Sequence, residues 1–207
     1  MVEQKKRRVR HEILAERDAL PESIARAKSQ AVIKRLVGLE EFRQAQTTLL
    51  YMATGSEVET RSLLPITKEA GKRAAVPFCR NNETRLRVSL VGSENDLEPA
   101  RFGILEPRKE RIREISVADA DLIIVPGIVF DLGGHRIGYG QGLYDRLLEG
   151  VARTPLVGLA YDLQIVDKLP KLHHDVAVDL IATESRLIEA QDGPPGAAFS
   201  SSKVTNS

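Results

Sequence analysis

The sequence is poor in cysteine and has no excess of charge of either sign. Its single cysteine, Cys79, excludes an internal disulfide and a zinc site built from several cysteines, which fits a reducing cytosol. The 207 residues include 30 basic and 29 acidic side chains, a formal net charge of +1. With so little net charge, no overall field attracts nucleic acid or an anionic membrane, and any anion site has to be local.

Long hydrophobic runs are also missing. The longest, residues 122–130, is interrupted by Pro126 and Gly127 and falls short of the ~20 apolar residues that cross a bilayer. The basic residues 1–8 are not followed by the apolar stretch of a signal peptide. These absences predict a cytoplasmic protein without a membrane or nucleic-acid partner. The sequence does not fix the oligomeric state, and a monomer is the favoured expectation.

The sequence does have the alternation of strands and helices that is typical of an α/β fold. Apolar residues make up 42% and charged residues 29%, as in ordinary globular proteins. We expect strands at 47–53, 74–78, 86–91, 121–125 and 155–161, and helices at 3–19, 22–37, 60–71 and 143–151. The pattern predicts a single domain, residues 1–190, with an open, mostly parallel sheet flanked by helices. Residues 191–207, rich in Gly, Pro and Ser, are expected to form a disordered tail.

Glycine is concentrated in one segment. Five of the fifteen glycines fall within ten consecutive positions: Gly133, Gly134, Gly138, Gly140 and Gly142. A glycine-rich loop that opens a helix forms a phosphate cradle when its free backbone N–H groups point into the loop. The alternative is a mobile connection between a strand and a helix. No Walker sequence G-x-x-x-x-G-K-[ST] is present, so the glycines alone leave both interpretations open.

Basic residues form a stripe near the N-terminus. Lys6, Arg10 and Arg17 share one face of the expected first helix because they are spaced by four and seven residues. Arg136 stands beside the glycine-rich segment. Such cations can bind a polyphosphate, but a solvated helix surface shows the same spacing. The stripe is therefore a candidate site with an ordinary alternative.

Seven acidic residues are candidates for catalysis or metal binding: Glu57, Glu59, Glu106, Asp131, Asp145, Asp175 and Asp179. Asp145 is foremost, because it follows the glycine-rich segment within the first turn of the expected helix. A carboxylate there either matches the helix dipole or holds Mg²⁺ against nucleotide phosphates, together with a second acid such as Asp179. His173 and His174 lack metal-ligand spacing and are expected in a turn.

Several motifs together resemble those of the 5-formyltetrahydrofolate cyclo-ligase family, also called methenyltetrahydrofolate synthetases. Residues 125–131 are similar to the family's P-G-x-x-F-D, and residues 136–146 to its R-x-G-x-G-x-G-Y-Y-D. Shorter matches follow in the family's order at 6–10, 57–60, 102–107, 158–164, 169–170, 174–175, 178–179 and 183–184. Each motif alone is weak evidence, but the ordered set spans residues 3–186.

The resemblance implies an open α/β sheet flanked by helices and a reaction that depends on ATP and Mg²⁺. In this reaction 5-formyltetrahydrofolate becomes 5,10-methenyltetrahydrofolate, with release of ADP and phosphate. The formyl oxygen attacks the γ-phosphorus of ATP, N10 captures the resulting imidate phosphate, and phosphate departs. Phosphoryl transfer requires the protein mainly to position the reactants and to neutralise charge.

The resemblance also implies roles for particular residues. Lys6, Arg10 and Arg136 are the expected catalytic cations. ATP is expected on Lys6, Arg10, Arg136, Ile137, Gly138, Tyr139, Gly140, Gln141, Gly142, Leu143 and Tyr144. Mg²⁺ is expected at Asp145 and Asp179. The folate is expected between Thr54 and Glu59 on one side and Tyr139, Gly140, Gln141, Gly142 and Leu143 on the other.

Two positions depart from the family's pattern. Gln141 replaces a glycine or a lysine, so no ammonium group is available there for a phosphate. Leu143 replaces the first tyrosine of Y-Y-D, which removes an aromatic platform and a hydroxyl group. Two other functions therefore stay open: a divergent ATP-binding enzyme that acts on another small N-acyl substrate, and a folate-binding protein without turnover.

Overall fold

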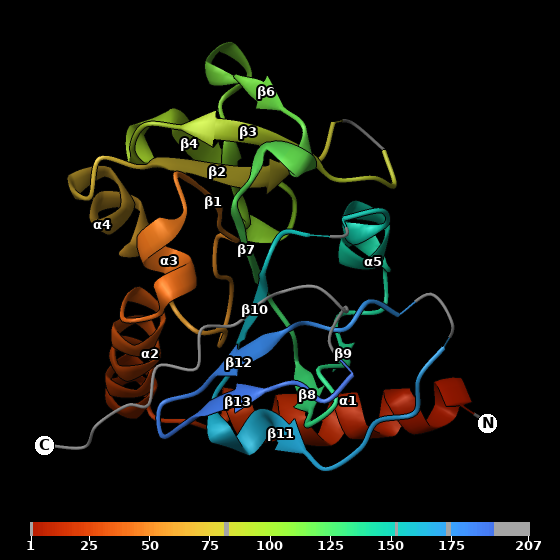
Figure 1. Cartoon of the computed structure of the whole chain (residues 1–207). Coiled ribbons are helices and arrows are strands. Elements are labelled where there is room, and N and C mark those ends of the chain that lie inside the picture. The colour runs from red at the N-terminus through yellow and green to blue at the C-terminus, as the bar shows by residue number, and fades with distance from the viewer. Residues whose placement is uncertain (1, 81–82, 152, 173–174, 193–207) are drawn as a thin grey trace, which may run out of the picture.

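An eight-stranded sheet forms the centre of the molecule (Figure 1). The computed structural model describes residues 2–80, 83–151, 153–172 and 175–192. Within them, the sheet consists of β1 (Thr47–Leu49), β2 (Arg73–Phe78), β3 (Arg87–Val91), β6 (Glu114–Ile115), β7 (Leu122–Val125), β10 (Leu156–Leu159), β12 (Leu180–Ala182) and β13 (Leu187–Glu189). A second sheet contains β8 (Val129–Asp131), β9 (Arg136–Ile137) and β11 (Ile165–Val166), and a third contains β4 (Leu97–Pro99) and β5 (Leu105–Pro107).

The strands of the large sheet lie in the order β13-β12-β10-β7-β1-β2-β3-β6. The middle strands, from β12 to β2, are parallel, and the strands at both edges are antiparallel. β1, β7, β10 and β12 are buried along their whole length, as expected of parallel strands covered on both faces. The predicted open, mostly parallel sheet flanked by helices is confirmed. Its parallel strands end at one common edge, where the loops after β1, β7 and β10 meet.

Helices cover both faces of the sheet. α2 (Glu22–Val37), α3 (Glu40–Gln44) and α4 (Leu63–Glu69) pack on the face that includes Ile124 of β7. α5 (Leu143–Leu148) packs on the opposite face, which includes Ile123. This division follows from the alternation of side chains along a strand. Short 3₁₀ helices lie at Glu94–Asp96, Arg101–Gly103, Lys109–Arg111, Val117–Asp119 and Asp162–Gln164.

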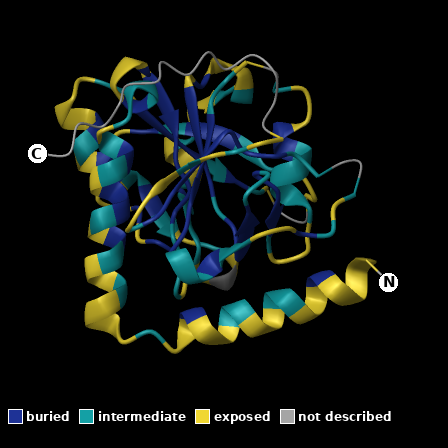
Figure 2. Ribbon diagram, turned by 60° about the horizontal axis from the view of Figure 1, so that its bottom comes forward, coloured by how far each residue is buried: buried dark blue, intermediate teal, exposed yellow. Residues whose placement is uncertain are grey.

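α1 (Val2–Asp18) runs alongside the small sheet of β8, β9 and β11, and its end meets the start of α2 (Figure 1). Much of its surface is exposed (yellow in Figure 2). Val9, Ile13 and Leu14 are partly buried, and they pack on Ile128, Val129, Ile137 and Leu169. Because the burial is partial, each contributes less than the ~1.5–3 kcal/mol of a fully buried aliphatic side chain. The position of α1 therefore depends on its polar contacts as well.

Short elements differ from the sequence-based expectations. β1 ends at Leu49, after which the chain leaves the sheet, and α4 begins at Leu63 rather than at Thr60. Elements of two to five residues show too little periodicity to be recognised. Among the α-helices and strands, those that were not expected are α3, β4, β5, β6, β8, β9, β11, β12 and β13.

The contacts of the domain continue two residues beyond position 190. The backbone N–H groups of Gln191 and Asp192 donate to the carbonyl oxygens of Leu132 and Gly133, at 3.2 and 3.3 Å. The rest of the expected tail, residues 193–207, lies outside the described residues, as do His173 and His174.

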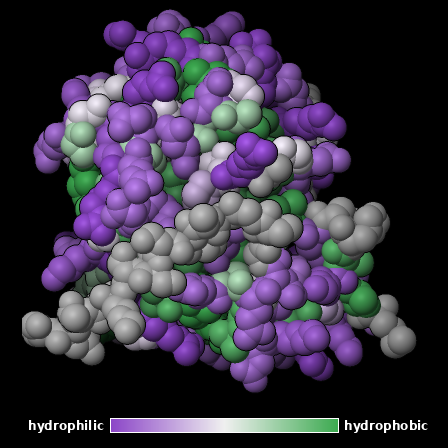
Figure 3. Space-filling view, viewed as in Figure 1, coloured by the Kyte–Doolittle hydropathy of each residue, from purple (hydrophilic) through white to green (hydrophobic). Residues whose placement is uncertain are grey.

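Hydrophilic side chains predominate on the face seen in Figure 3, where hydrophobic side chains form smaller patches between them. In the part of the chain that the structure describes, no helix is both long enough and apolar enough to cross a membrane.

Candidate functional site

The glycine loop, residues 138–142, connects β9 to α5. Gly140 and Gly142 have φ values of +90° and +61°, a backbone conformation that favours glycine. A Cβ on Gly140 would lie 3.3 Å from Nη2 of Arg10, so a side chain would also crowd that guanidinium. Because α5 has only six residues, its dipole adds little here. Positive charge at the loop comes from basic side chains instead.

Basic side chains of α1 reach this loop and the segment beside it. Arg10 Nε donates a hydrogen bond to the Gly138 carbonyl oxygen at 2.7 Å. Lys6 Nζ lies 2.5 Å from Asp175 Oδ2, and both side chains are about nine-tenths buried. Arg17, farther along the same face, is only 1% exposed. Lys6 and Arg17 are therefore buried rather than part of a solvated charged surface, and Arg10 is half-buried.

Two ion pairs combine into one group, which we call the acid–base cluster: Lys6, Arg136, Asp145 and Asp175. Arg136 donates from Nη2 to Asp145 Oδ1 at 2.9 Å and from Nη1 to the Val176 carbonyl oxygen at 2.6 Å. The Val176 N–H in turn lies 3.4 Å from Asp145 Oδ1, which brings Asp145 close to the segment that carries Asp175. Burial lowers the pKa of Arg136, and the charges of both carboxylates oppose this shift. The cluster thus balances two acids against two bases.

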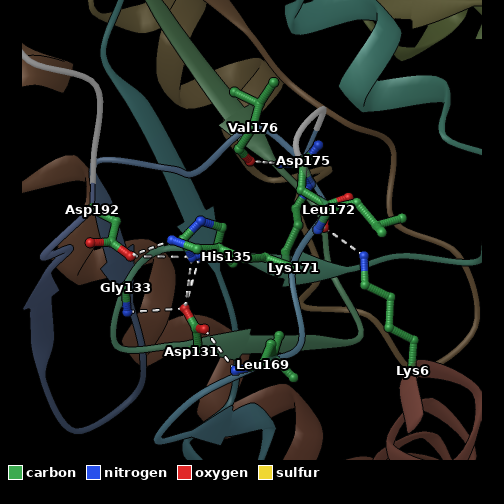
Figure 4. A network of polar contacts seen from close by, with 11 residues as sticks. Lys6, Asp131, Gly133, His135, Leu169, Lys171, Leu172, Asp175, Val176 and Asp192 are labelled. Atoms are coloured by element: carbon green, nitrogen blue, oxygen red, sulfur yellow. Dashed lines mark hydrogen bonds and ion pairs between the residues drawn. The ribbon is translucent and has the colours of Figure 1, made fainter. Parts of the chain in front are cut away.

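A second polar network holds the segment that carries Asp175 (Figure 4). Asp131, at the end of β8, is 2% exposed. Its Oδ1 accepts the His135 N–H at 2.9 Å, and its Oδ2 accepts the Leu169 N–H at 2.8 Å. Farther along, the Leu172 N–H donates to Asp175 Oδ2 at 2.8 Å. Asp131 therefore fixes the backbone at Leu169, near the start of the segment that leads from β11 to Asp175. The backbone N–H of Leu172 then orients the Asp175 carboxylate toward Lys6.

Asp179 contacts a different part of the fold. It directly precedes β12, and its Oδ2 accepts the backbone N–H of Leu156, the first residue of β10, at 2.8 Å. Its Oδ1 is buried and has no hydrogen-bond partner among the described residues. Burial raises the pKa of Asp179, and the nearby charge of Glu41 adds to this shift. No hydrogen bond within the described parts of the chain joins Asp179 to Asp145.

The loop of residues 54–59 follows β1 and faces α1. The Thr54 N–H donates to Glu57 Oε2 at 3.0 Å, and the Glu57 N–H donates to the Thr54 carbonyl oxygen at 3.2 Å, which closes a tight turn. Ser56 Oγ accepts a hydrogen bond from Arg17 Nε at 2.9 Å. Glu59 is exposed at the end of this loop. Thr54 and Glu59 thus lie on one short loop that is attached to the first helix.

Four tyrosines lie near Glu57. Burial, followed by the negative charge of Glu57, raises the pKa values of Tyr51, Tyr139 and Tyr144. The Tyr161 hydroxyl donates to the Glu57 carbonyl oxygen at 3.5 Å. The Tyr144 hydroxyl is buried and has no partner among the residues that the structure describes. Burial also raises the pKa of Glu57, against the hydrogen bond from Thr54 and the charge of Arg17.

The other residues expected at the ATP and the folate lie along the chain from β9 to α5. Ile137 is buried against α1. Gln141 is exposed, and its carbonyl oxygen accepts a hydrogen bond from Arg146 Nη2 at 2.7 Å. Leu143 is half-buried and belongs to none of the three hydrophobic clusters of the described residues. Its side chain is therefore not part of the core.

Three residues of this region were not assigned to the site from the sequence: Arg17, Glu57 and Asp175. Arg17 does share the helix face of Lys6 and Arg10, and the two acids are among the seven candidates. The sequence feature that could have identified Arg17 was its spacing of seven residues from Arg10, which places both on one helix face. For the acids, no local sequence pattern showed which of the seven candidates would face the basic residues.

The pKa of Glu57 generates a prediction about stability. Because its pKa is raised in the folded state, the folded chain binds a proton more readily than the unfolded chain, and stability falls as pH rises through the folded pKa. The substitution Glu57→Gln keeps an oxygen for the Thr54 N–H and removes the charge. We expect a higher Tm than wild type at pH 8, with a difference that closes toward pH 4, by thermal unfolding at several pH values.

The matched control is Glu59→Gln, which changes an exposed carboxylate two residues away and should follow wild type within about 0.5 kcal/mol. A lower Tm of Glu57→Gln than of wild type at pH 8 would contradict the prediction. It would mean that the attraction between the Glu57 carboxylate and Arg17 stabilises the fold by more than the burial of that carboxylate costs.

Comparisons with known proteins agree with the motifs. Residues 2–184 match the 5-formyltetrahydrofolate cyclo-ligase family. The 5-formyltetrahydrofolate cyclo-ligase of Mycolicibacterium smegmatis is 31% identical over 189 residues, which cover 89% of this chain and 96% of the relative. The NMR structure of Aquifex aeolicus 5,10-methenyltetrahydrofolate synthetase has a TM-score of 0.80 and 34% identity, with 91% of this chain and 94% of that chain covered. The synthetase from Mycoplasma pneumoniae has a TM-score of 0.69 and 25% identity, with 86% and 98% covered. The resemblance is thus confirmed, and the chain belongs to the 5-formyltetrahydrofolate cyclo-ligase family.

Proposed function

We propose that this chain catalyses the ATP- and Mg²⁺-dependent cyclisation of 5-formyltetrahydrofolate to 5,10-methenyltetrahydrofolate, with release of ADP and phosphate. Family membership supports the substrate and the reaction. The observation that carries the proposal is the convergence of Lys6, Arg10 and Arg136 beside the glycine loop, next to two carboxylates. Bases and acids in this arrangement suit a polyphosphate that arrives together with a metal ion.

The chemistry starts from a formamide, whose oxygen is a poor leaving group. Transfer of the γ-phosphoryl group from ATP to the formyl oxygen makes it a good one and releases ADP. N10 then attacks the formyl carbon, the N10–C bond forms, and N10 loses its proton. The C–O bond breaks and phosphate leaves. In such a transfer the protein mainly positions the reactants and stabilises charge, so the phosphate-binding groups are central to catalysis.

We assign the phosphates to the glycine loop, Arg10 and Lys6. Arg10 uses Nε for the Gly138 carbonyl oxygen, while its terminal nitrogens lie beside Gly140 without a hydrogen bond to any described residue. Lys6 forms an ion pair with Asp175. Phosphate oxygens would compete with Asp175 for Lys6, and the released carboxylate could then take a cation. This exchange lets the nucleotide and the metal bind together without an unbalanced charge.

We assign Mg²⁺ to Asp145 and Asp175. Among the described residues no group of three or more His, Cys, Asp or Glu could hold a metal, so the phosphates and water must supply the other ligands, as Mg²⁺ prefers. The Asp145 side chain is 27% exposed and accessible to such a complex. Asp179 is a weaker choice, because its burial favours the neutral acid. When bound, Mg²⁺ neutralises charge on the transferred phosphoryl group.

We assign the folate to the space between the 54–59 loop and the glycine loop. Thr54 and Glu59 lie on the first loop, and Tyr139 lies on the second. Arg17 forms hydrogen bonds to both loops, which shows that they are neighbours. A substrate there would lie next to the phosphates on the glycine loop, as transfer to the formyl oxygen requires.

The direct test mixes the pure protein with 5-formyltetrahydrofolate and MgATP and follows the absorbance of methenyltetrahydrofolate. We expect product only when folate, ATP and Mg²⁺ are all present, with one ADP for each methenyltetrahydrofolate. Product at the same rate without nucleotide would exclude the ligase. Folate binding without turnover would indicate a binding protein, and ADP release with only another N-acyl substrate would indicate a divergent enzyme.

The metal assignment predicts different effects for three acids. Asp145→Asn and Asp175→Asn should each lower kcat/KM for MgATP by about tenfold to a hundredfold and raise the Mg²⁺ concentration for half-maximal rate. Asp179→Asn is the matched control, and we expect an unchanged Mg²⁺ requirement. Initial rates over a Mg²⁺ series measure the difference. An altered Mg²⁺ requirement in Asp179→Asn, together with a normal Mg²⁺ requirement in Asp175→Asn, would show that Asp179 and not Asp175 binds the metal with Asp145.

The position of Leu143 outside the core predicts a gain of substrate affinity. An aromatic ring against the folate contributes about 0.5–1.5 kcal/mol beyond area burial, so Leu143→Tyr should lower KM for 5-formyltetrahydrofolate roughly threefold to tenfold. KM for ATP should change little. The control Leu147→Tyr places the same ring in the core and should destabilise by ~1–3 kcal/mol. If Leu143→Tyr instead melts lower and binds folate no better, Leu143 does not face the substrate.

A further inference from the structure

Arg17 is a fully buried cation without an ion pair. Its side chain is 1% exposed, and no carboxylate lies within 4.0 Å of its guanidinium among the described residues. The charge of Glu57 acts on Arg17 without direct contact, and burying a cation that no carboxylate contacts is costly, so its hydrogen bonds have to stabilise it. In the proposed reaction Arg17 contacts no reactant.

The hydrogen bonds of Arg17 run to three different loops. Nε donates to Ser56 Oγ at 2.9 Å, in the loop after β1. Nη1 lies 3.4 Å from the carbonyl oxygen of Gly127, in the turn after β7. Nη2 donates to the Tyr139 hydroxyl at 3.1 Å, in the glycine loop. One guanidinium therefore joins α1 to the loops that we assign to the folate and to the nucleotide.

Two of the three partner groups of Arg17 form further hydrogen bonds, and the third forms none with any described residue. Ser56 Oγ donates onward to Asp18, and the Gly127 carbonyl oxygen also accepts from Gln164 Nε2 at 2.9 Å. Tyr139 is different, because it is 53% exposed and stands between two glycines. Its hydroxyl forms the only side-chain hydrogen bond that the described structure shows for residue 139. The bond to Arg17 therefore restrains an exposed residue of the glycine loop.

We propose that Arg17 is a positioning residue that keeps the glycine loop in register with the 54–59 loop. The role rests on the proposed function, because register matters only if a nucleotide on one loop reacts with a folate on the other. A misplacement of about 1 Å between reacting groups can lower a rate by a factor of about a hundred. Arg17 would act on the rate through this distance, without touching the reacting atoms. A purely structural role would instead stabilise α1 and leave the loop unaffected.

Amide hydrogen exchange of the ligand-free protein separates these roles. In Arg17→Met, we expect exchange over residues 138–142 to be at least about tenfold faster than in wild type, with the sheet unchanged. Arg8→Met is the matched control on the same helix, since Arg8 is exposed and paired only with Glu12, and it should behave as wild type. Unchanged exchange in the loop, or an equal increase throughout the chain, would overturn the proposal.

Tyr139→Phe removes the other partner of the same hydrogen bond. It should speed exchange of the loop in the same direction, and the double variant with Arg17→Met should be no faster than Arg17→Met alone, because both remove one interaction. Additive effects would overturn the proposal. If Arg17→Met does not fold, Tyr139→Phe decides alone, and wild-type exchange in its glycine loop would be the contrary result.

Kinetics provide the second readout. Arg17→Met should lower kcat about tenfold to a hundredfold while both KM values change less than about threefold. A normal kcat per folded molecule with a lower Tm would show that Arg17 only stabilises α1. If wild type shows no turnover at all, the proposed function fails, while the exchange data still decide whether Arg17 holds the two loops together.

Discussion

The attachment of α1 to the end of the sheet is the constraint on which the candidate site depends. Its apolar contacts are few and partial, so the helix is held largely by three inward-facing cations. Each reaches a different segment: the segment after β11, the glycine loop and the loop after β1. None of these segments is regular secondary structure, so none is stabilised by a continuous series of backbone hydrogen bonds of its own. A helix formed from the first residues of the chain thus organises loops that come from the rest of it.

Charge balance explains how so many charged side chains can be buried together. A buried charge without a partner destabilises a fold strongly, whereas a paired one is tolerated. Lys6 with Asp175 and Arg136 with Asp145 meet this condition. In the proposed function, phosphates would pair with Lys6 while Asp145 and Asp175 pair with Mg²⁺, so each charged side chain of the cluster would keep a partner of opposite charge.

The sequence was sufficient for the long helices, for most of the buried strands and for the position of the glycine loop, but not for the short elements or for the partners of the charged residues. Long helices and buried strands have a periodicity that can be read, which is why the parallel centre of the sheet could be predicted. The pairing of Asp145 with Asp179 could not be judged in this way. Asp179 directly precedes a strand and binds the start of its neighbour, whereas Asp175 lies in an irregular segment whose course is set by Asp131. Such long-range contacts leave no local pattern.

The grouping of tyrosines around Glu57 has a consequence for spectroscopy. The chain has no tryptophan and four tyrosines, and all four interact with either the side chain or the backbone of Glu57. The intrinsic near-ultraviolet fluorescence of the protein therefore originates largely near Glu57, from Tyr139 and Tyr144 of the candidate site and from Tyr51 and Tyr161 of the adjoining core. A ligand that enters between the two loops will change the surroundings of these rings before it changes anything else that emits light. The unmodified protein thus carries its own optical reporter of binding.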